Sequence, residues 1–352
     1  MSRLHRQSLI AYGAPLCETL ADIPEPRGSE VLVRVNRCGV CHSDLHMQDG
    51  YFLLGDEKKL DVRAGRTLPF TLGHEIAGVI ERAGADAEGA TPDRPVAVYP
   101  WIGCGQCAAC RRGDENICAA PRHLGIQVDG GYATHVLIPH PRYLIDYAPL
   151  TPSLAATLMC SGLTAYAALK RLAAHAALGP ALLVGMGGVG MMGLALARVM
   201  FAHAPIVADV DAAKREAALA AGAAAAFDPA DPGARKALLA ATGGGAYAVC
   251  DFVGSEHSLA FATGALAKGG KALVTGLFGG TFTMPVAMFS LKAIAIEGIQ
   301  TGTLAEAREV VDLARRWKLA APVLTERPLA QAQATLEALR AGRVVGRVVL
   351  TA

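Results

Sequence analysis

The chain has 352 residues, which is long enough for two domains with separate hydrophobic cores. Lysine and arginine together number 33 against 31 acidic residues, a formal net charge of +2, so no charge excess favours nucleic acid or an anionic membrane as a partner. We therefore expect the partner to be a small molecule. The N-terminus has no apolar run typical of a signal peptide, and no stretch approaches the ~20 apolar residues of a membrane-spanning helix, so we expect a cytoplasmic protein.

Short β-branched runs separated by glycine and proline characterise residues 1–150. Examples are the runs at 31–35 and 76–80. Such runs, bounded by turn residues, are typical of strands joined by irregular loops. We predict an all-β barrel for this region.

Two segments of this β-rich region concentrate side chains that can carry chemistry. The first holds a thiol, a hydroxyl, a carboxylate and two imidazoles: Cys41, His42, Ser43, Asp44 and His46. The second is the tripeptide Gly73-His74-Glu75. Taken singly, a cysteine or a histidine is more often a packed or exposed side chain than a ligand. Only the two segments taken together indicate a functional site.

Four further cysteines form a compact cluster with the spacing Cys-x2-Cys-x2-Cys-x7-Cys. They are Cys104, Cys107, Cys110 and Cys118. In a cytosolic chain such a cluster indicates a metal site rather than a disulfide framework. A bacterial ferredoxin motif closes with three residues and a proline, whereas the last gap here is seven residues, which favours zinc over an iron–sulfur cluster. Because four protein ligands leave no open position for substrate, we predict a structural zinc site.

From about residue 162 onward, short strand-like runs alternate with alanine-rich segments of helical length. The predicted strands are Ala181–Val184, Ile206–Ala208, Ala248–Phe252, Ala272–Thr275 and Ala293–Ile296. This alternation is the signature of βαβ units and a parallel sheet. Two helical segments, 304–317 and 329–341, then precede a final strand at 347–350 that we expect to rejoin the first region.

A glycine-rich turn follows the first of these strands. It comprises Gly185, Gly187, Gly188, Val189 and Gly190. The pattern is a weak signal alone, but a strand precedes it, a helix follows it, and Asp209 ends the next strand 19 residues beyond Gly190. The helix N-terminus would bind a pyrophosphate, and the Asp209 carboxylate would accept from the ribose hydroxyls and repel a 2′-phosphate. We predict a dinucleotide site that prefers NAD over NADP.

Together these segments resemble the zinc-dependent medium-chain alcohol dehydrogenase family over nearly the whole chain. The resemblance rests on GVCHSDLH, GHE, the four-cysteine cluster, the isolated Cys160, GMGGVG with Asp209, and GRVVL at 346–350. It implies an α/β fold with a GroES-like β-barrel catalytic domain at 1–161 and 300–352, which carries the structural zinc lobe at about 100–120. It also implies a doubly wound Rossmann coenzyme-binding domain at 162–299.

The resemblance further implies a catalytic zinc ion, and so two Zn²⁺ per chain with NAD as coenzyme. By this similarity its ligands are Cys41, His74 and Cys160, a two-cysteine, one-histidine set that leaves one position for water or alcohol. Asp44 would orient His74, and Glu75 could approach the metal during ligand exchange. The implied reaction is reversible hydride transfer between a primary or secondary alcohol and NAD⁺, with an aldehyde or ketone as product.

Five residues take supporting roles by the same similarity. Ser43 would receive the alcohol proton and pass it through the nicotinamide ribose to His46. His42 and Arg347 stand where family members place basic residues against the coenzyme pyrophosphate, and Lys214 resembles the contact to the adenosine ribose. His42, Arg347 and Lys214 could each equally be surface residues.

Two features depart from the common pattern or bear on assembly. The segment 47–67 is longer than in compact tetrameric members, and we expect it to reshape the pocket entrance. Tyr51, Phe52 and Trp101 are candidates for a pocket wall, with core packing as the safer interpretation, and they favour a bulky or cyclic alcohol.

The short connection from Cys118 to Cys160 resembles that of bacterial tetramers, so we expect a homotetramer, with a homodimer as the alternative.

Three other functions stay open at this stage. A metal-free quinone or enone reductase on the same fold would lack the ligand set that Cys41, His74 and Cys160 complete. A zinc-dependent polyol dehydrogenase typically has glutamate where Cys160 stands. The third is a catalytically silent protein that binds NAD and zinc. Which alcohol reacts, in which direction and with which stereochemistry depends on pocket shape, which these motifs do not encode.

Overall fold

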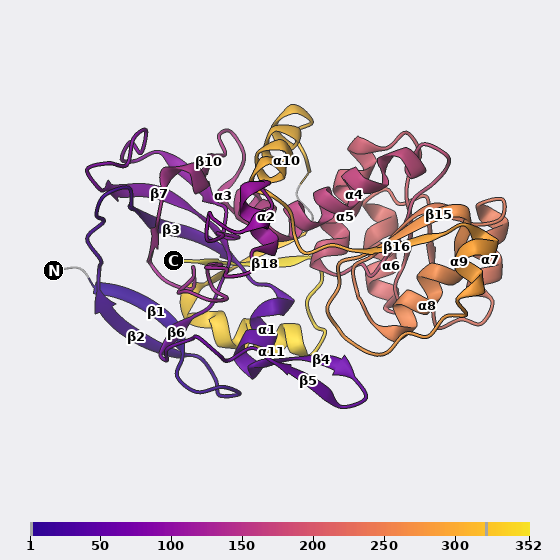
Figure 1. The fold of residues 1–352 in the computed structure, drawn as a ribbon, viewed down its shortest axis with the longest axis horizontal. Coiled ribbons are helices and arrows are strands. Elements are labelled where there is room, and N and C mark those ends of the chain that lie inside the picture. The colour runs from indigo at the N-terminus through magenta and orange to yellow at the C-terminus, as the bar shows by residue number, and fades with distance from the viewer. Residues whose placement is uncertain (1–2, 321–322) are drawn as a thin grey trace.

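The computed structural model describes residues 3–320 and 323–352 and shows two bodies side by side (Figure 1). The first body is built from β-strands, whereas a parallel sheet flanked by helices forms the second. Helix α10 bridges them on one side of the molecule, and the C-terminal strand returns to the first body.

The first body contains one antiparallel sheet, one mixed but mainly antiparallel sheet, and a separate hairpin. Its strands are β1 (Arg3–Leu9), β2 (Cys17–Asp22), β3 (Val31–Gly39), β6 (Phe70–Thr71), β7 (Glu75–Ala83), β8 (Pro95–Val98), β9 (His135–Ile138), β10 (Leu144–Asp146), β17 (Leu324–Pro328) and β18 (Arg347–Thr351), with the hairpin β4 (Tyr51–Gly55) and β5 (Lys58–Asp61). One sheet has the order β2-β1-β6 and the other β10-β8-β7-β3-β18-β17, with β9 also paired to β3. The β18–β17 pair is parallel.

Strands β3 and β7 form the centre of the larger sheet. The predicted runs at 31–35 and 76–80 lie within them, and most of their side chains are buried. Strand β18 pairs antiparallel with β3, so the end of the chain rejoins the first body as the sequence predicted. The antiparallel β3–β7 pair sets Gly39 opposite Glu75, next to the predicted ligand His74.

Short helices in the first body present the residues predicted to carry chemistry. They are α1 (His42–Asp49), α2 (Ala108–Arg111), a 3-10 turn at Glu115–Ile117, a 3-10 turn at Pro141–Tyr143 and α3 (Pro152–Thr157). Helix α1 begins immediately after Cys41 and ends at Asp49, and the following Gly50 adopts a left-handed conformation with φ +82°.

The second body contains a six-stranded, wholly parallel sheet with the order β13-β12-β11-β14-β15-β16. These strands are β11 (Leu182–Val184), β12 (Ile206–Ala208), β13 (Ala225–Phe227), β14 (Ala246–Asp251), β15 (Leu266–Val274) and β16 (Ala295–Gly298). The order reverses between β11 and β14, which is the arrangement of the doubly wound dinucleotide-binding fold. All five strands predicted from the sequence are present; β13 adds a sixth, whose alanine-rich sequence carries little strand signal.

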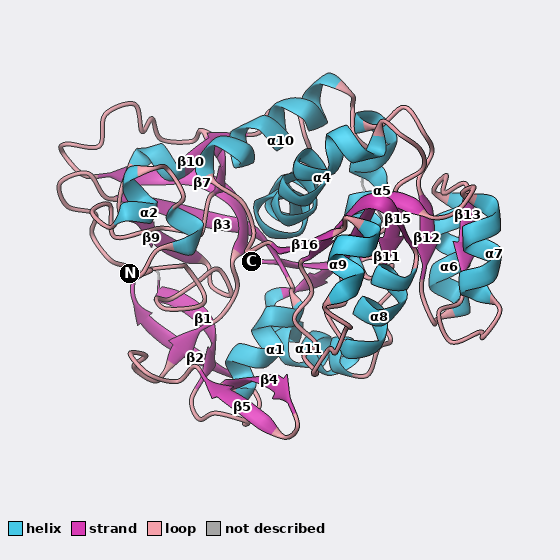
Figure 2. Ribbon diagram, turned by 45° about the vertical axis from the view of Figure 1, so that its right-hand side comes forward, coloured by secondary structure: helices cyan, strands magenta, loops and turns pink. Residues whose placement is uncertain are grey.

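Helices cover both faces of the parallel sheet, with α4 and α5 on one side and α8 and α9 on the other (Figure 2). They are α4 (Leu163–Ala176), α5 (Gly188–Met200), α6 (Ala212–Ala220), α7 (Ala234–Ala241), α8 (Glu256–Gly264) and α9 (Ala287–Lys292). Leu183 packs into one hydrophobic cluster, and its neighbours Leu182 and Val184 pack into another. This burial on both faces explains why the strand is continuously apolar.

The C-terminal helices agree with their predictions to within a few residues. Helix α10 spans Leu304–Arg316, and its N-cap Thr303 forms a reciprocal pair of hydrogen bonds with Glu306. The segment predicted at 329–341 consists of a 3-10 turn, Leu329–Gln331, followed by α11, Ala332–Arg340.

The expectation that no stretch could span a membrane is wrong by length and composition. Residues Pro152–Ala176 form one continuous helical run of 25 residues with a mean hydropathy of 1.2 in its most apolar window. That window is 94% buried inside the protein, as in a core helix. Alanine keeps the run apolar enough to pass the test while leaving it small enough to pack tightly between the two bodies. The predicted domain boundary between 161 and 162 falls inside this run.

Candidate active site

The structure brings Cys41, His74 and Cys160 together, although 33 and 86 residues separate them along the chain. Their sulfur and nitrogen atoms all lie within 4.8 Å of one another, and all three side chains are buried. Cys41 is the N-cap of α1, and His74 immediately precedes β7. Where these elements meet, their side chains form a buried cluster of metal-binding atoms.

Asp44 determines the local geometry at Cys41. As the third residue of α1, it accepts a hydrogen bond from the Cys41 N–H at 2.8 Å, which satisfies a free amide at the helix start. The other oxygen of this fully buried carboxylate lies 3.3 Å from His74 Nδ1. The predicted orientation of His74 by Asp44 therefore has a geometric basis.

His74 is buried beside a carboxylate and keeps a free ring nitrogen. Burial by itself would lower the pKa of His74, but the neighbouring Asp44 carboxylate outweighs it and raises that pKa. In the described part of the chain, the buried Nε2 of His74 has no hydrogen-bond partner. A buried, unpaired nitrogen beside two thiols fits a zinc ion better than a packed core histidine, which would find a protein partner.

Cys160 lies in a widened helical turn. Residues Leu158–Gly162 form one π-helical turn between α3 and α4, a distortion that is frequent at functional sites. The next residue, Ser161, donates its N–H to Glu75 Oε1 at 3.1 Å. Hydrogen bonding from the Cys160 thiol lowers the pKa of Cys41, which favours the thiolate that a metal requires.

Glu75 and Arg347 form a buried ion pair beside this cluster. Arg347 Nε lies 3.2 Å from Glu75 Oε2, and a second guanidinium nitrogen donates to Oε1. A Cβ atom on Gly188, in the glycine-rich turn, would come within 2.7 Å of Arg347 Cδ. Arg347 therefore lies against the predicted pyrophosphate turn while its guanidinium is held by Glu75, a partner that the sequence motifs did not reveal.

The four-cysteine cluster is also assembled. Cys107 Sγ lies 3.5 Å from Cys110 Sγ and 3.8 Å from Cys118 Sγ, and Cys104 donates its N–H to Cys118 at 3.2 Å. Backbone N–H groups of Cys110 and Ala119 lower the pKa of Cys107 to about 6. Four sulfur atoms within 4.8 Å of one another match a closed tetrahedral site.

We expect the substitution Cys107→Ala to remove one zinc equivalent and to lower the midpoint of thermal unfolding by on the order of 10 °C, because metal binding at such a site is folding free energy. Turnover per folded molecule should stay near the wild-type value. Differential scanning fluorimetry with metal analysis checks this, with Cys17→Ala, an exposed cysteine, as the control. Equal stability of the two variants would exclude a structural role for the cluster.

The predicted coenzyme residues lie at the carboxyl end of the parallel sheet. Strand β11 leads through Gly185, at φ +90°, into α5, and a cavity of about 570 Å³ opens beside this turn. Asp209 follows β12 at the cavity wall, and its Oδ2 accepts the Met186 N–H of the turn at 2.6 Å. Lys214 lies on α6, 3.9 Å from Asp211. The carboxylate thus supports the glycine turn as well as facing the predicted ribose site.

We expect Asp209→Asn to raise the ratio of NADP⁺ to NAD⁺ use by about ten-fold, because it removes the charge that repels a 2′-phosphate yet keeps an oxygen for the Met186 N–H. Steady-state kinetics with both coenzymes measures the ratio. Asp211→Asn is the matched control, since it removes the same charge two residues away at the N-cap of α6. The same change in both variants would remove Asp209 from the ribose site.

The predicted proton relay lies on α1. Ser43 Oγ is 3.8 Å from Cys41 Sγ, close to the predicted metal. The ring centroid of His46 is 5.8 Å from that of His42, and burial lowers the pKa of both imidazoles. A lowered pKa keeps His46 neutral near pH 7 and therefore able to accept a proton.

The aromatic candidates differ in their surroundings. The ring of Trp101 lies 5.4 Å from that of His74, and its Nε1 donates to the Met159 carbonyl at 3.0 Å. Phe52 packs on His46 with centroids 4.5 Å apart. Tyr51 instead has the Lys59 ammonium over its ring. Of the three candidates, Trp101 is the one whose ring lies beside a predicted ligand, although it is also a buried core residue.

Tyr132 is a site residue that the sequence motifs missed. Its fully buried hydroxyl donates to Asp44 Oδ2 at 2.7 Å, so it helps to hold the carboxylate that faces His74. The two residues are 88 apart, and nothing in the local sequence around Tyr132 marks it. Only a prediction of which strands meet could have found this contact.

We expect Tyr132→Phe to weaken zinc binding at the buried site by up to about ten-fold, because partners of a metal-ligating histidine tune metal affinity. Competition with a chromogenic chelator measures this without any turnover. Tyr99→Phe is the matched control, since Tyr99 is equally buried and loses a hydrogen bond to the Gly302 carbonyl. Identical zinc affinities in the two variants would argue against a positioning role for Tyr132.

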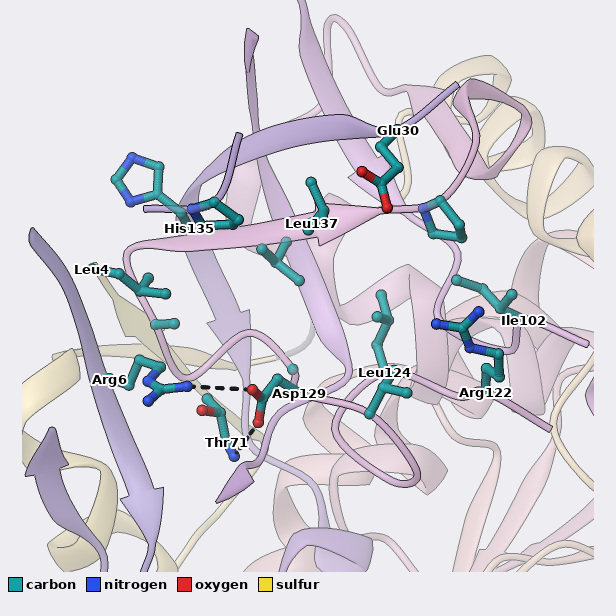
Figure 3. A pocket seen from close by; sticks show the side chains of 16 residues that line it. Leu4, Arg6, Glu30, Thr71, Ile102, Arg122, Leu124, Asp129, His135 and Leu137 are labelled. Carbon is teal, nitrogen blue, oxygen red and sulfur yellow. Dashed lines mark hydrogen bonds and ion pairs between the residues drawn. The ribbon is translucent and has the colours of Figure 1, made fainter. Parts of the chain in front are cut away.

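A second cavity, of about 300 Å³, lies in the first body away from this site (Figure 3). Arg6 at one end pairs with Asp129, which also accepts the Thr71 N–H (Figure 3). Glu30 and Arg122 add one charge of each sign. These balanced charges define no particular ligand.

Comparison with known proteins decides the family. A model described as "Alcohol dehydrogenase GroES-like domain" matches residues 27–148, and one described as "Zinc-binding dehydrogenase" matches 188–316. An NAD-dependent alcohol dehydrogenase of Sulfurisphaera tokodaii is 36% identical over 97% of this chain and 98% of that protein. The chain belongs to the zinc-dependent medium-chain alcohol dehydrogenase family.

Solved structures agree with this membership. The alcohol dehydrogenase of Aeropyrum pernix superposes with a TM-score of 0.87 at 31% identity, covering 99% of this chain and 100% of that one. The D-arabinose dehydrogenase of Sulfolobus solfataricus reaches a TM-score of 0.85 at 26% identity, with both chains fully covered. Family membership confirms the predicted fold class, the alcohol dehydrogenase class of enzyme and the use of zinc and NAD.

Proposed function

We propose that the family's reaction, hydride transfer between an alcohol and NAD⁺, takes place at a zinc ion held by Cys41, His74 and Cys160. The observation that carries this is the convergence of two thiols and one unpaired imidazole nitrogen in a buried cluster of the described chain. A zinc ion held there would be a Lewis acid that lowers the pKa of a substrate hydroxyl. Side chains of this protein would orient the ligands and transfer the proton.

Those side chains orient ligands and move a proton. Asp44 holds His74 through Nδ1, which leaves Nε2 for the metal. Ser43, at the start of α1, accepts the hydroxyl proton, and His46 delivers it toward solvent with the help of the coenzyme ribose. Glu75 places a carboxylate near the proposed ligands, and Arg347 balances the negative charge of that carboxylate. These roles are proposals that rest on position and chemistry.

The coenzyme would bind along the carboxyl edge of the parallel sheet. The turn from Gly185 to Gly190 and the start of α5 offer amide donors to the pyrophosphate. Asp209 would accept from the adenosine ribose, with Lys214 nearby. His42 and Arg347 would hydrogen-bond the pyrophosphate; what supports this is that Arg347 packs against Gly188 of the turn and His42 packs on Phe278, which follows β15.

A bulky or cyclic alcohol is the substrate class that we propose. The observation behind it is the aromatic ring of Trp101 beside His74, because a flat apolar wall favours substrates with matching apolar area. The likeness to D-arabinose dehydrogenase supports a second candidate, a sugar oxidised at its hemiacetal hydroxyl. A sugar would need more polar contacts than this wall offers.

Zinc stoichiometry and a substrate panel test the proposal together. We expect two zinc ions per chain and NAD⁺ reduction with secondary, cyclic or aromatic alcohols. D-arabinose in the same panel measures the second candidate. One zinc ion per chain and no turnover with any alcohol or sugar would overturn the catalytic-zinc proposal and favour a silent binding protein or a metal-free reductase.

We also propose a homotetramer, with a homodimer as the alternative. Strand β16 is the edge of the parallel sheet, and several large apolar side chains of the preceding segment are exposed: Val286, Phe289 and Leu291. An exposed apolar patch beside a free strand edge is typical of a surface that another chain covers. Light scattering after size exclusion measures the assembly, and a monomer at micromolar concentration would contradict it.

A cytoplasmic location and the predicted domain division complete the proposal. Nine cysteines are all present as free thiols, and seven of them lie in the two metal-binding groups, which suits a reducing compartment. The coenzyme domain would span 162–299 and the catalytic domain the remainder, with the helix Pro152–Ala176 shared between them. Limited proteolysis that cuts near 300 but spares this helix would support that division.

A further inference from the structure

The hairpin β4–β5, within the long segment 47–67, reaches from the catalytic body to the coenzyme body. Figures 1 and 2 show it below α1 and α11, projecting beyond them. At its tip, Asp56 Oδ2 accepts a hydrogen bond from Thr281 Oγ1 at 3.1 Å. We call residues 51–61 the strap and residues 278–281 the coenzyme loop.

The strap and the coenzyme loop touch backbone to backbone. A Cβ atom on Gly55 would lie 2.6 Å from Thr281 Oγ1 and 2.7 Å from the Gly280 carbonyl carbon. From the other side, a Cβ atom on Gly279 would collide with the carbonyl oxygen of Leu53. Only glycine permits this approach at both positions, and both have positive φ angles.

The coenzyme loop borders the cleft where the dinucleotide binds. It follows β15, and Gly279 donates its N–H to the Gly254 carbonyl at 2.9 Å, at the carboxyl end of the sheet. The neighbouring Val253 lines the coenzyme cavity and packs against Gly185 of the glycine-rich turn. The strap therefore meets the coenzyme body at the edge of the sheet where ligands enter and leave.

A row of four aromatic rings joins the coenzyme loop to the strap across α1. Phe278 of the coenzyme loop packs on His42 with centroids 4.6 Å apart, and Phe52 of the strap packs on His46 at 4.5 Å. His42 and His46 are themselves 5.8 Å apart on α1. Each histidine thus packs on a ring from one of the two segments in contact: His42 on the coenzyme loop and His46 on the strap.

We propose that the strap holds the coenzyme loop over the bound dinucleotide and, through Phe52 and Phe278, positions His46 and His42. Release of coenzyme then requires the strap to separate from the coenzyme loop, which makes this contact a control point for a step that often limits turnover. The proposal goes beyond the chemistry of the metal site, and it depends on the proposed function only in that the cleft binds NAD.

Stopped-flow measurement of NADH dissociation tests the strap without any substrate. Gly55→Ala should press the strap away from the coenzyme loop, and Thr281→Val should remove the single hydrogen bond at the tip. We expect dissociation to be about five-fold faster for each variant, which is the size of effect that one lost contact of this kind produces. Wild-type holoenzyme supplies the reference rate.

Matched controls separate the contact from general strain. Gly65→Ala also places a side chain at positive φ in the long segment, but its Cβ would meet nothing within 4 Å. Thr283→Val repeats the hydroxyl loss two residues from Thr281 at an exposed position. Both controls should release NADH at the wild-type rate.

Two outcomes overturn the proposal in distinguishable ways. If Gly55→Ala and Thr281→Val release NADH no faster than their controls, the strap does not hold the coenzyme loop, and the proposed function is untouched. If wild-type protein binds no NADH at all, the proposed function and the strap fail together. The thermal unfolding midpoint of each variant, measured in the same buffer, shows whether the protein that released NADH was folded.

Discussion

Substituting alanine for Cys160 is expected to remove one of two zinc ions and to lower turnover by at least about 10⁴-fold. The reason is that a zinc ion held there would lower the pKa of the alcohol hydroxyl by several units, and each unit corresponds to about 1.4 kcal/mol. Cys160 is buried within 4.8 Å of the other two proposed ligands, and a methyl group cannot replace its sulfur. Elemental analysis of the purified variant, beside NAD⁺ reduction, measures both effects.

Cys250→Ala is the control for the loss of a buried thiol. Cys250 is as buried as Cys160 but lies in β14 of the parallel sheet, outside both metal-binding groups. This variant should keep two zinc ions and wild-type turnover with a modest loss of stability. Full activity in Cys160→Ala would show that the catalytic zinc is held elsewhere or is absent.

The second large effect is expected from Arg347→Met. Removing the guanidinium leaves the Glu75 carboxylate buried without its counter-charge, and breaking a buried pair in this way costs about 3–5 kcal/mol of folding stability. NADH affinity should fall as well, because Arg347 packs against Gly188 of the glycine-rich turn. Urea unfolding and NADH titration measure the two effects separately.

Two further variants test whether the uncompensated Glu75 charge causes the loss of stability in Arg347→Met. Adding Glu75→Gln to Arg347→Met should recover part of the lost stability, since the uncompensated charge disappears. Lys170→Met breaks the half-exposed pair with Glu309 and should cost no more than about 1 kcal/mol. If Arg347→Met were as mild as Lys170→Met, the buried pair would not contribute the stability expected of it.

Local patterns determined the parallel sheet and the metal-binding groups. Apolar runs of strand length, alternating with helical segments, predicted five of the six parallel strands because strands buried on both faces must be continuously apolar. The clustered cysteines at 104–118 predicted their own site because ligands so near in sequence can surround one ion without help from the rest of the fold. The alanine-rich β13 was missed, since alanine carries little strand preference.

The sequence by itself determined the family, through motifs whose spacing is local, and with it the residue types of the buried site. Only the tertiary structure decided which distant groups support that site: the Tyr132 hydroxyl on Asp44, the Arg347 guanidinium on Glu75, and the strap on the coenzyme loop. These contacts join residues 88, 272 and 225 positions apart, so they depend on how sheets and bodies pack. A local pattern cannot encode them, because hydrogen bonds and ion pairs of this kind form only where packing has already brought the backbones together.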